Sequence, residues 1–164
     1  GRVAEVYRQA EAIMGCVPNA FHMYSGSPTV LETQWQQTAY FMRHPTLSFP
    51  LLALMRMLVS QDHRCAYCID LNAAMLIERA GFTPEQIAAT RRDQAAAPLD
   101  ARDKAMLLFA LKATRTPLEV CAADIDSLKL LGWAESDILD AVVHGARNMA
   151  ADIVFNTFKI DNDL

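Results

Sequence analysis

Apolar residues recur at steps of three and four along nearly the whole chain, and this spacing restricts the fold more than any other feature of the sequence. From Val3 to Met14 the pattern is uninterrupted and stops at Gly15, a residue typical of the position just past a helix end. The same spacing predicts helices near residues 31–42, 51–59, 65–80, 101–116, 125–131 and 136–153, with a short helix beginning at residue 84. No segment alternates cleanly between apolar and polar residues. We therefore expect an all-α fold of seven to eight helices.

Residues that begin helices stand where this pattern needs them. Ser48 can cap a helix whose first turn contains Pro50, where the missing N–H costs nothing. The run Thr83-Pro84-Glu85-Gln86 supplies a cap, a first-turn proline and a capping-box glutamine. Asp100 can cap another helix, after a stretch from Gln94 to Pro98 that is the best linker candidate. A second core is not required, so residues 1–164 are expected to form one domain.

The composition is that of a folded protein and disfavours several functional classes. Of 164 residues, 52% are apolar and 21% are charged, and the formal net charge is −4, so no basic surface for a nucleic acid is indicated. The apolar run from Leu51 to Val59 contains Arg56 and falls far short of the roughly 20 residues of a membrane span. The segment Gly1–Glu5 has no apolar signal core. We expect a cytoplasmic protein that binds neither nucleic acid nor membrane.

Two of the four cysteines, Cys65 and Cys68, are three residues apart at the predicted start of a helix. Helix N-termini favour thiolates, and this separation lets two sulfurs meet and close a disulfide. A purely structural role for the pair and half of a zinc site are the alternatives. Zinc needs about four ligands, and the sequence adds only the isolated Cys16, Cys121 and His63. The spacing favours a redox dithiol.

A longer stretch of sequence around these cysteines resembles a known family. The residues that carry the resemblance are 51–61, Cys65-Ala66-Tyr67-Cys68, Gly81-Phe82, the helix starting at 98–103, the turn at 132–139 and the segment 148–158. Over about residues 20 to 160 the chain is similar to the alkylhydroperoxidase D-like and carboxymuconolactone decarboxylase-like proteins, and especially to members described as peroxidase-related.

The resemblance implies an all-helical alkylhydroperoxidase D-like fold that assembles into trimers or hexamers. It also implies that Cys68 attacks a peroxide and that Cys65 resolves the oxidised sulfur as a disulfide. An external dithiol would then restore both thiols, with no metal or organic cofactor.

Two positions depart from the family pattern, which places a glutamate twelve residues before the first cysteine and a histidine four residues after the second. Here those positions hold Ala53 and Asn72, neither of which titrates. General acid–base assistance is commonly worth about a hundredfold or more. We therefore expect slow peroxide turnover compared with a member that carries both residues.

Four residues near the pair are candidates for a supporting role. His63 has a suitable intrinsic pKa and can approach the thiols if the chain turns back before the helix, although an exposed loop histidine is the alternative. Tyr67 can donate a hydrogen bond but is a poor base near neutral pH. Gln61 can orient a thiol or a water, or can simply be a polar helix end. Asn72 shares a helix face with Cys68 and can bond a sulfur or contact another subunit.

Another pair of titratable residues stands four positions apart on the last predicted helix. Asp140 and His144, with Arg147 beyond them, are either a proton-handling dyad or, by the usual behaviour of such spacing, a solvated helix pair.

The sequence thus predicts a thiol-dependent oxidoreductase that reduces a hydroperoxide or a disulfide through Cys65 and Cys68. A non-catalytic helical oligomer that binds a small ligand or senses redox state is the alternative, and a lactone decarboxylase rests on family kinship alone. The expected partners are copies of the same chain, the oxidised substrate and a dithiol reductant.

Overall fold

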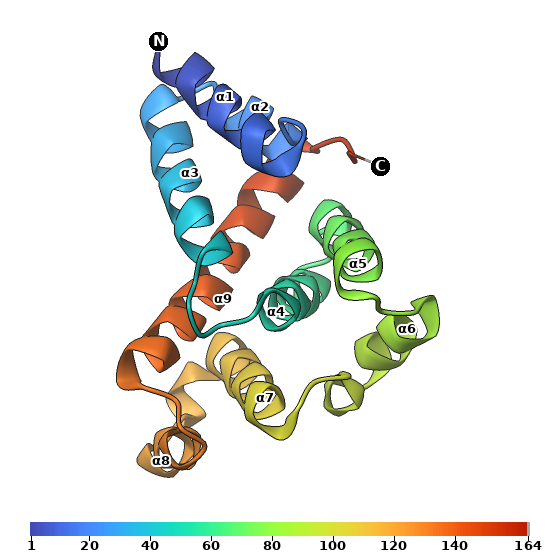
Figure 1. Ribbon diagram of the computed structural model, residues 1–164, viewed down its shortest axis with the longest axis vertical. Helices are drawn as coiled ribbons and strands as arrows, with labels where there is room; N and C mark the ends of the chain where they lie inside the picture. Colours follow the sequence, from blue (N-terminus) through green and yellow to red (C-terminus); the bar gives the residue numbers. More distant parts are fainter. Residues whose placement is uncertain (164) are drawn as a thin grey trace.

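Nine α-helices make up most of residues 1–163, the part of the chain that this computed structural model describes, and no strand lies among them (Figure 1). The all-α prediction is confirmed. The helices are α1 (Arg2–Met14), α2 (Asn19–Tyr24), α3 (Pro28–Met42), α4 (Phe49–Asp62), α5 (Ala66–Ala80), α6 (Pro84–Arg92), α7 (Ala101–Arg115), α8 (Ala122–Leu130) and α9 (Glu135–Phe158). The expected count of seven to eight missed α2, which has only six residues and is too short to show a helical period.

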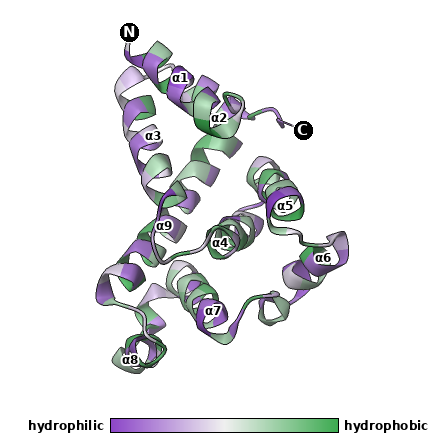
Figure 2. Cartoon of the chain, viewed as in Figure 1, coloured by the Kyte–Doolittle hydropathy of each residue, from purple (hydrophilic) through white to green (hydrophobic). Residues whose placement is uncertain are grey.

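Helix α4 lies at the centre of the molecule, and α5, α7 and α9 pack around it (Figure 1). Its residues are apolar on every side, and all but Arg56 are buried between Leu51 and Ser60. Figure 2 shows hydrophobic residues predominating in α4 and α5 and hydrophilic residues along the outer helix α1. Ser48 caps α4 as predicted, since its Oγ accepts a hydrogen bond from the Leu51 N–H at 3.3 Å.

The other start and stop signals also act as predicted. Thr83 and Gln86 form a capping box at α6, and Asp100 accepts a hydrogen bond from the Asp103 N–H at the start of α7. The predicted linker contains a short 3₁₀ turn at Gln94–Ala96. No helix within residues 1–163 has the length and apolar content to cross a membrane.

Helices α1, α2 and α3 form a second, smaller core at one end of the molecule (Figure 1). Phe21 of α2 lies edge-on to Trp35 of α3, with ring centroids 5.6 Å apart. The Trp35 indole N–H donates a hydrogen bond to Gln9 Oε1 of α1 at 2.6 Å. These contacts tie the three helices together at the end of the molecule where α9 finishes.

Helix α9 crosses both α4 and α7, and Gly145 makes this close packing possible. A Cβ atom at position 145 would lie 2.9 Å from Cγ2 of Thr114 on α7, closer than van der Waals contact allows. The hydrogen in place of a side chain therefore lets the middle of α9 approach the central helices.

A tight turn joins α4 to α5 and positions the cysteine pair. Arg64 adopts a left-handed backbone conformation with φ of 54°, which is uncommon for a residue with a side chain. The Cys65 N–H then donates a hydrogen bond to the Ser60 carbonyl at 3.0 Å. The chain reverses within these few residues, so the first turn of α5 lies beside the last turn of α4.

Candidate dithiol site

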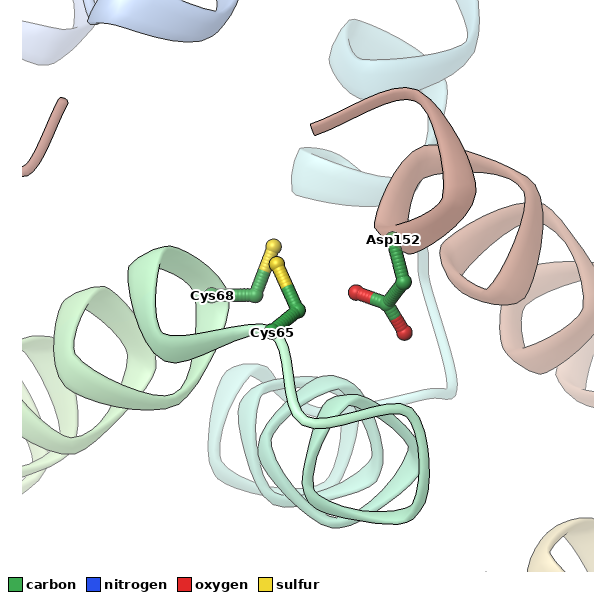
Figure 3. Close-up of side chains that lie close together, drawn as sticks. All are labelled: Cys65, Cys68 and Asp152. Carbon is green, nitrogen blue, oxygen red and sulfur yellow. The ribbon is translucent and has the colours of Figure 1, made fainter. Parts of the chain in front are cut away.

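Two thiols and one carboxylate meet where the start of α5 faces α9. Cys65 is the N-cap of α5, Cys68 lies in its first turn, and Asp152 comes from α9. The two Sγ atoms and a carboxylate oxygen of Asp152 all lie within 4.8 Å of one another. Figure 3 shows the sulfurs side by side, with the Asp152 carboxylate turned toward them. Both thiols are free, and the sequence prediction that they lie at a helix N-terminus is confirmed.

The surroundings make the two thiols unequal. Contact with the Cys68 thiol, which can donate a hydrogen bond to a Cys65 thiolate, lowers the pKa of Cys65, and the Cys68 backbone N–H acts in the same direction. The same contact, together with burial, raises the pKa of Cys68. The first proton lost from the pair therefore leaves the negative charge on Cys65, where the positive end of α5 also favours it.

Asp152 is completely buried and held by polar neighbours. The Ser60 hydroxyl donates a hydrogen bond to its Oδ1 at 2.7 Å, and the Asn148 side-chain amide lies 3.4 Å from its Oδ2. Burial is the largest influence on Asp152 and raises its pKa. A carboxylate in this position can accept a proton from either thiol and return it later.

His63 is the one supporting candidate from the sequence that lies beside this group. Its Nδ1 is 3.6 Å from Asp152 Oδ2 and donates a hydrogen bond to the Val59 carbonyl at 2.9 Å. The His63 side chain is 32% exposed to solvent, whereas the Asp152 side chain is fully buried. The predicted turn before the helix thus brings an imidazole between the buried carboxylate and solvent.

The other three supporting candidates use their polar atoms elsewhere. Tyr67 donates its hydroxyl hydrogen to Asp163. Gln61 is paired with Arg91 of α6 through both ends of its amide. Asn72 donates to the Cys68 carbonyl at 2.8 Å and accepts a hydrogen bond from Arg56 Nε at 2.8 Å, so its amide bonds the backbone of that cysteine.

The pair Asp140 and His144 on α9 forms neither a dyad nor a solvated helix pair. Asp140 Oδ2 lies 2.8 Å from Nε2 of His44. His144 is only 2% exposed, and its Nε2 lies 3.4 Å from Nη1 of Arg56. The two side chains therefore belong to different clusters.

The two cysteines of the pair line different cavities. Cys68 contributes to the wall of a cavity of about 440 Å³ that lies among α2, α3, α4, α5 and α9. Cys65 contributes to a smaller cavity of about 240 Å³ beside Asn156 and Lys159, near the end of α9. Cys65 and Cys68 are only 1% and 6% exposed, so these two cavities are the spaces from which a small reactant can approach each of them.

The three potential ligand atoms of the site also suit a metal ion in part. Two thiolates and a carboxylate are acceptable zinc ligands, but a structural zinc site usually has four. Within residues 1–163 no fourth cysteine, histidine or acid joins the cluster at the same separation. Cys16 and Cys121 are both exposed and lie outside this cluster.

Asp152, Ser60 and Arg56 were not identified from the sequence. Asn148 and Asp152 are polar residues four apart on a helix face that otherwise packs against α4, and Ser60 interrupts an apolar run. Polar residues at such positions need partners when they are buried. That requirement indicates that Ser60, Asn148 and Asp152 bond to one another, but it does not indicate that they lie beside the thiols.

Comparison with known proteins gives one family and a set of similar structures. The sequence model of the carboxymuconolactone decarboxylase family matches residues 30–112. An uncharacterized peroxidase-related protein from Silicibacter sp. TM1040 is 24% identical, with a TM-score of 0.84 over 96% of this chain and 83% of that one. An uncharacterized peroxidase-related protein with an alkylhydroperoxidase AhpD core, from Ralstonia eutropha JMP134, is 22% identical, with a TM-score of 0.85 over 98% of this chain and 85% of that one. No curated protein matches.

Proposed function

Because this chain belongs to the carboxymuconolactone decarboxylase family and holds two thiols beside a buried carboxylate, we propose that it is a thiol-dependent oxidoreductase that reduces a hydroperoxide or a disulfide. One observation carries the proposal: the two sulfurs and an Asp152 oxygen lie within 4.8 Å of one another. That arrangement combines a pair able to form a disulfide with a group able to take up the proton released.

The reaction with a hydroperoxide proceeds in two steps. The Cys68 sulfur attacks an oxygen of the peroxide, its proton passes to the Cys65 thiolate, and the O–O bond breaks. Cys68 becomes a sulfenic acid, and the alkoxide leaves as an alcohol by taking up the proton that Asp152 accepted when Cys65 ionised. Cys65 then attacks the Cys68 sulfur and its own proton goes to Asp152, which passes this proton to the hydroxyl group as it leaves as water. Two thiols and one hydroperoxide have given a disulfide, an alcohol and water.

The cycle closes by thiol–disulfide exchange with an external dithiol. One donor thiolate attacks the Cys65 sulfur from the smaller cavity, and Cys68 leaves as a thiolate. The second donor thiol then displaces Cys65 and forms the donor disulfide. A disulfide substrate is reduced by the same exchange run in the opposite direction, starting from the thiol pair.

Asp152 supplies a proton acceptor that the residues at positions 53 and 72 lack. It reaches the thiols from α9, whereas Ala53 and Asn72 lie on α4 and α5. His63 then connects Asp152 with solvent. We include this pair in the proposal as the route by which protons leave and re-enter the buried site.

The test counts thiols and turnovers separately. In a chain whose exposed Cys16 and Cys121 are replaced by serine, one equivalent of cumene hydroperoxide should remove two thiols and lower the intact mass by about two hydrogens, with no added oxygen. With dithiothreitol present, peroxide consumption should continue in this chain and stop in the further variants Cys65→Ser and Cys68→Ser.

Two other results would redirect the proposal. Disulfide formation without continued turnover would favour a redox sensor in place of an enzyme. Equal peroxide consumption by all three chains would remove the pair from the chemistry altogether.

We also propose that copies of the chain associate through the outer face of α9. Leu139, Val143 and Ile153 are 63%, 44% and 64% exposed. With Ala146 and Ala150 they follow alternating steps of four and three residues, the pattern of a helix–helix seam.

A further inference from the structure

The larger cavity is positively charged in a chain whose net charge is negative. Three arginines, Arg56, Arg79 and Arg147, contribute to its wall, together with His44 and His144, and no aspartate or glutamate does so. The net charge of the whole chain is −4. The cavity that Cys68 lines is therefore positively charged, although the chain as a whole is negatively charged.

Arg56 carries its charge in the interior without a carboxylate. Its Nε donates a hydrogen bond to Asn72 Oδ1 at 2.8 Å, and its Nη1 contacts the neutral imidazole of His144. Neither partner is an anion, and no ion pair to Arg56 exists within residues 1–163. Burial lowers the pKa of Arg56 to about 10, so the guanidinium stays charged at neutral pH.

Arg147, another residue of the cavity wall, also has no carboxylate partner within residues 1–163. One of its terminal nitrogens donates to Thr38 Oγ1 at 2.7 Å and to the Gln34 carbonyl at 3.0 Å, while its buried Nε has no partner. His144, which is 2% exposed, also lines this wall. Buried donors normally have partners, because an unsatisfied one costs about 1–3 kcal/mol. Among the described residues, the wall thus holds one donor without a partner, Arg147 Nε, and two arginine charges without an anionic partner.

A Cys68 thiolate accounts for at most one of these charges. It raises the pKa of Arg56, but the resting pair carries its negative charge on Cys65, which lines the other cavity. Asp152 lines neither cavity. A second positive charge therefore remains unmatched in every protonation state of the site.

The rest of the cavity wall is mainly apolar. The side chains involved come from α2, α3, α4 and α5 and include Phe21, Phe41, Leu52, Leu71 and Met75. The volume of about 440 Å³ falls in the range of small-molecule sites, about 300–1,000 Å³. A ligand that fits has an apolar body and an anionic group.

We propose that this cavity binds organic acids with an apolar chain or ring, and that the carboxylate is held by Arg56 and Arg147 while the apolar part lies against Phe41 and Leu52. The inference rests on the proposed function for its last step, in which the oxidised group of such an acid reaches Cys68. The substrate class is then a carboxylate-bearing hydroperoxide or disulfide, in place of a neutral one.

The binding test uses a protein that has no redox chemistry. Decanoate and decanol are titrated by calorimetry into a chain with Cys65→Ser and Cys68→Ser, and into the same chain with Arg56→Gln or Arg147→Gln. Arg92→Gln, a change at an exposed arginine of α6 outside the cavity, is the matched control. Circular dichroism confirms that each variant is folded.

Decanoate should bind at least tenfold more tightly than decanol, and each cavity variant should weaken decanoate at least tenfold, as loss of one partner of a buried charge pair does. Arg92→Gln should leave both affinities unchanged. Equal binding of the acid and the alcohol, or no binding of either, would overturn the proposal without any need for the arginine variants.

A reactivity test separates this inference from the proposed function. Wild-type protein should be oxidised at least tenfold faster by a fatty-acid hydroperoxide than by its methyl ester, and Arg56→Gln should remove the difference. If decanoate binds but neither hydroperoxide oxidises the thiols, the ligand site stands and the redox function falls. If both hydroperoxides react equally, the redox function stands and the carboxylate preference is refuted.

Discussion

Replacing the buried carboxylate of Asp152 by an amide should change thiol acidity and peroxide turnover in opposite directions. An ionised Asp152 opposes a second negative charge on either sulfur, and it raises the pKa of both Cys65 and Cys68. Asp152→Asn removes that charge and keeps the shape, and the Ser60 hydroxyl can still donate to the amide oxygen. Both thiols should therefore ionise more easily in the variant.

The separation of the three groups sets the size of the effect. With a carboxylate oxygen within 4.8 Å of each sulfur, the Coulomb energy is about 3.5 kcal/mol at an effective dielectric constant of about 20, and about 0.9 kcal/mol in bulk water. These energies bracket the cost that Asp152 adds to ionising a thiol, so the thiol pKa should fall when Asp152→Asn removes the charge. The buried position of Asp152 favours the upper half of that range of energies.

The assay is the rate of iodoacetamide alkylation against pH, in a chain whose Cys16 and Cys121 are serines so that only the pair reacts. The midpoint of the profile should move to lower pH in Asp152→Asn. Peroxide turnover by the same protein should fall about a hundredfold, because the proton acceptor is lost. Asp70→Asn is the matched control, since Asp70 is an exposed carboxylate two positions after Cys68.

Two outcomes would refute this reasoning. An alkylation profile that does not move would show that Asp152 bears no charge beside the thiols. A faster alkylation accompanied by unchanged turnover would show that the carboxylate is near the sulfurs but does not accept their protons.

Three further predictions concern stability and assembly. Burial holds the pKa of His144 well below 6.5, so below pH 6.5 the unfolded chain binds a proton that the folded chain does not. The free energy of unfolding should therefore fall by up to about 1.4 kcal/mol for each pH unit below 6.5. Urea unfolding of His144→Gln should lack this dependence on pH, whereas the exposed-site variant His22→Gln should keep it. Gly145→Ala should lower the free energy of unfolding by about 1–3 kcal/mol through overpacking against Thr114, and Thr114→Ala should restore it, so equal destabilisation in the double variant would contradict the steric explanation. If the chain associates through α9 as proposed, the wild type should sediment as an oligomer in analytical ultracentrifugation and Ile153→Lys as a monomer; a wild-type chain that is already monomeric would refute the interface on α9.

The helices were predictable because their signals are local. A run of apolar residues, a cap such as Ser48 or Asp100, and a glycine such as Gly81 act within one or two turns, so a single sequence contains all the information needed. The exception is α2, whose six residues form a helix because Phe21 packs on Trp35, a contact between distant positions that no local pattern reveals.

The candidate site was predictable only in the part that local spacing determines. The Cys65 and Cys68 pair is recognisable from its separation and from the turn that precedes it. Asp152 lies more than 80 positions away and joins the thiols only because α9 crosses α4. Arg56 was visible as a charge in an apolar run, but that it has no carboxylate partner is a property of the packed structure.

The position of the two cysteines on separate cavities has a kinetic consequence. Under the proposed function, the oxidant reaches Cys68 from one cavity and the electron donor reaches Cys65 from the other. A bulky alcohol that is slow to leave would then not hinder the donor from reaching the second sulfur of the disulfide. With this arrangement, an excess of one reactant should not inhibit the protein by filling the cavity through which the other reactant approaches its sulfur.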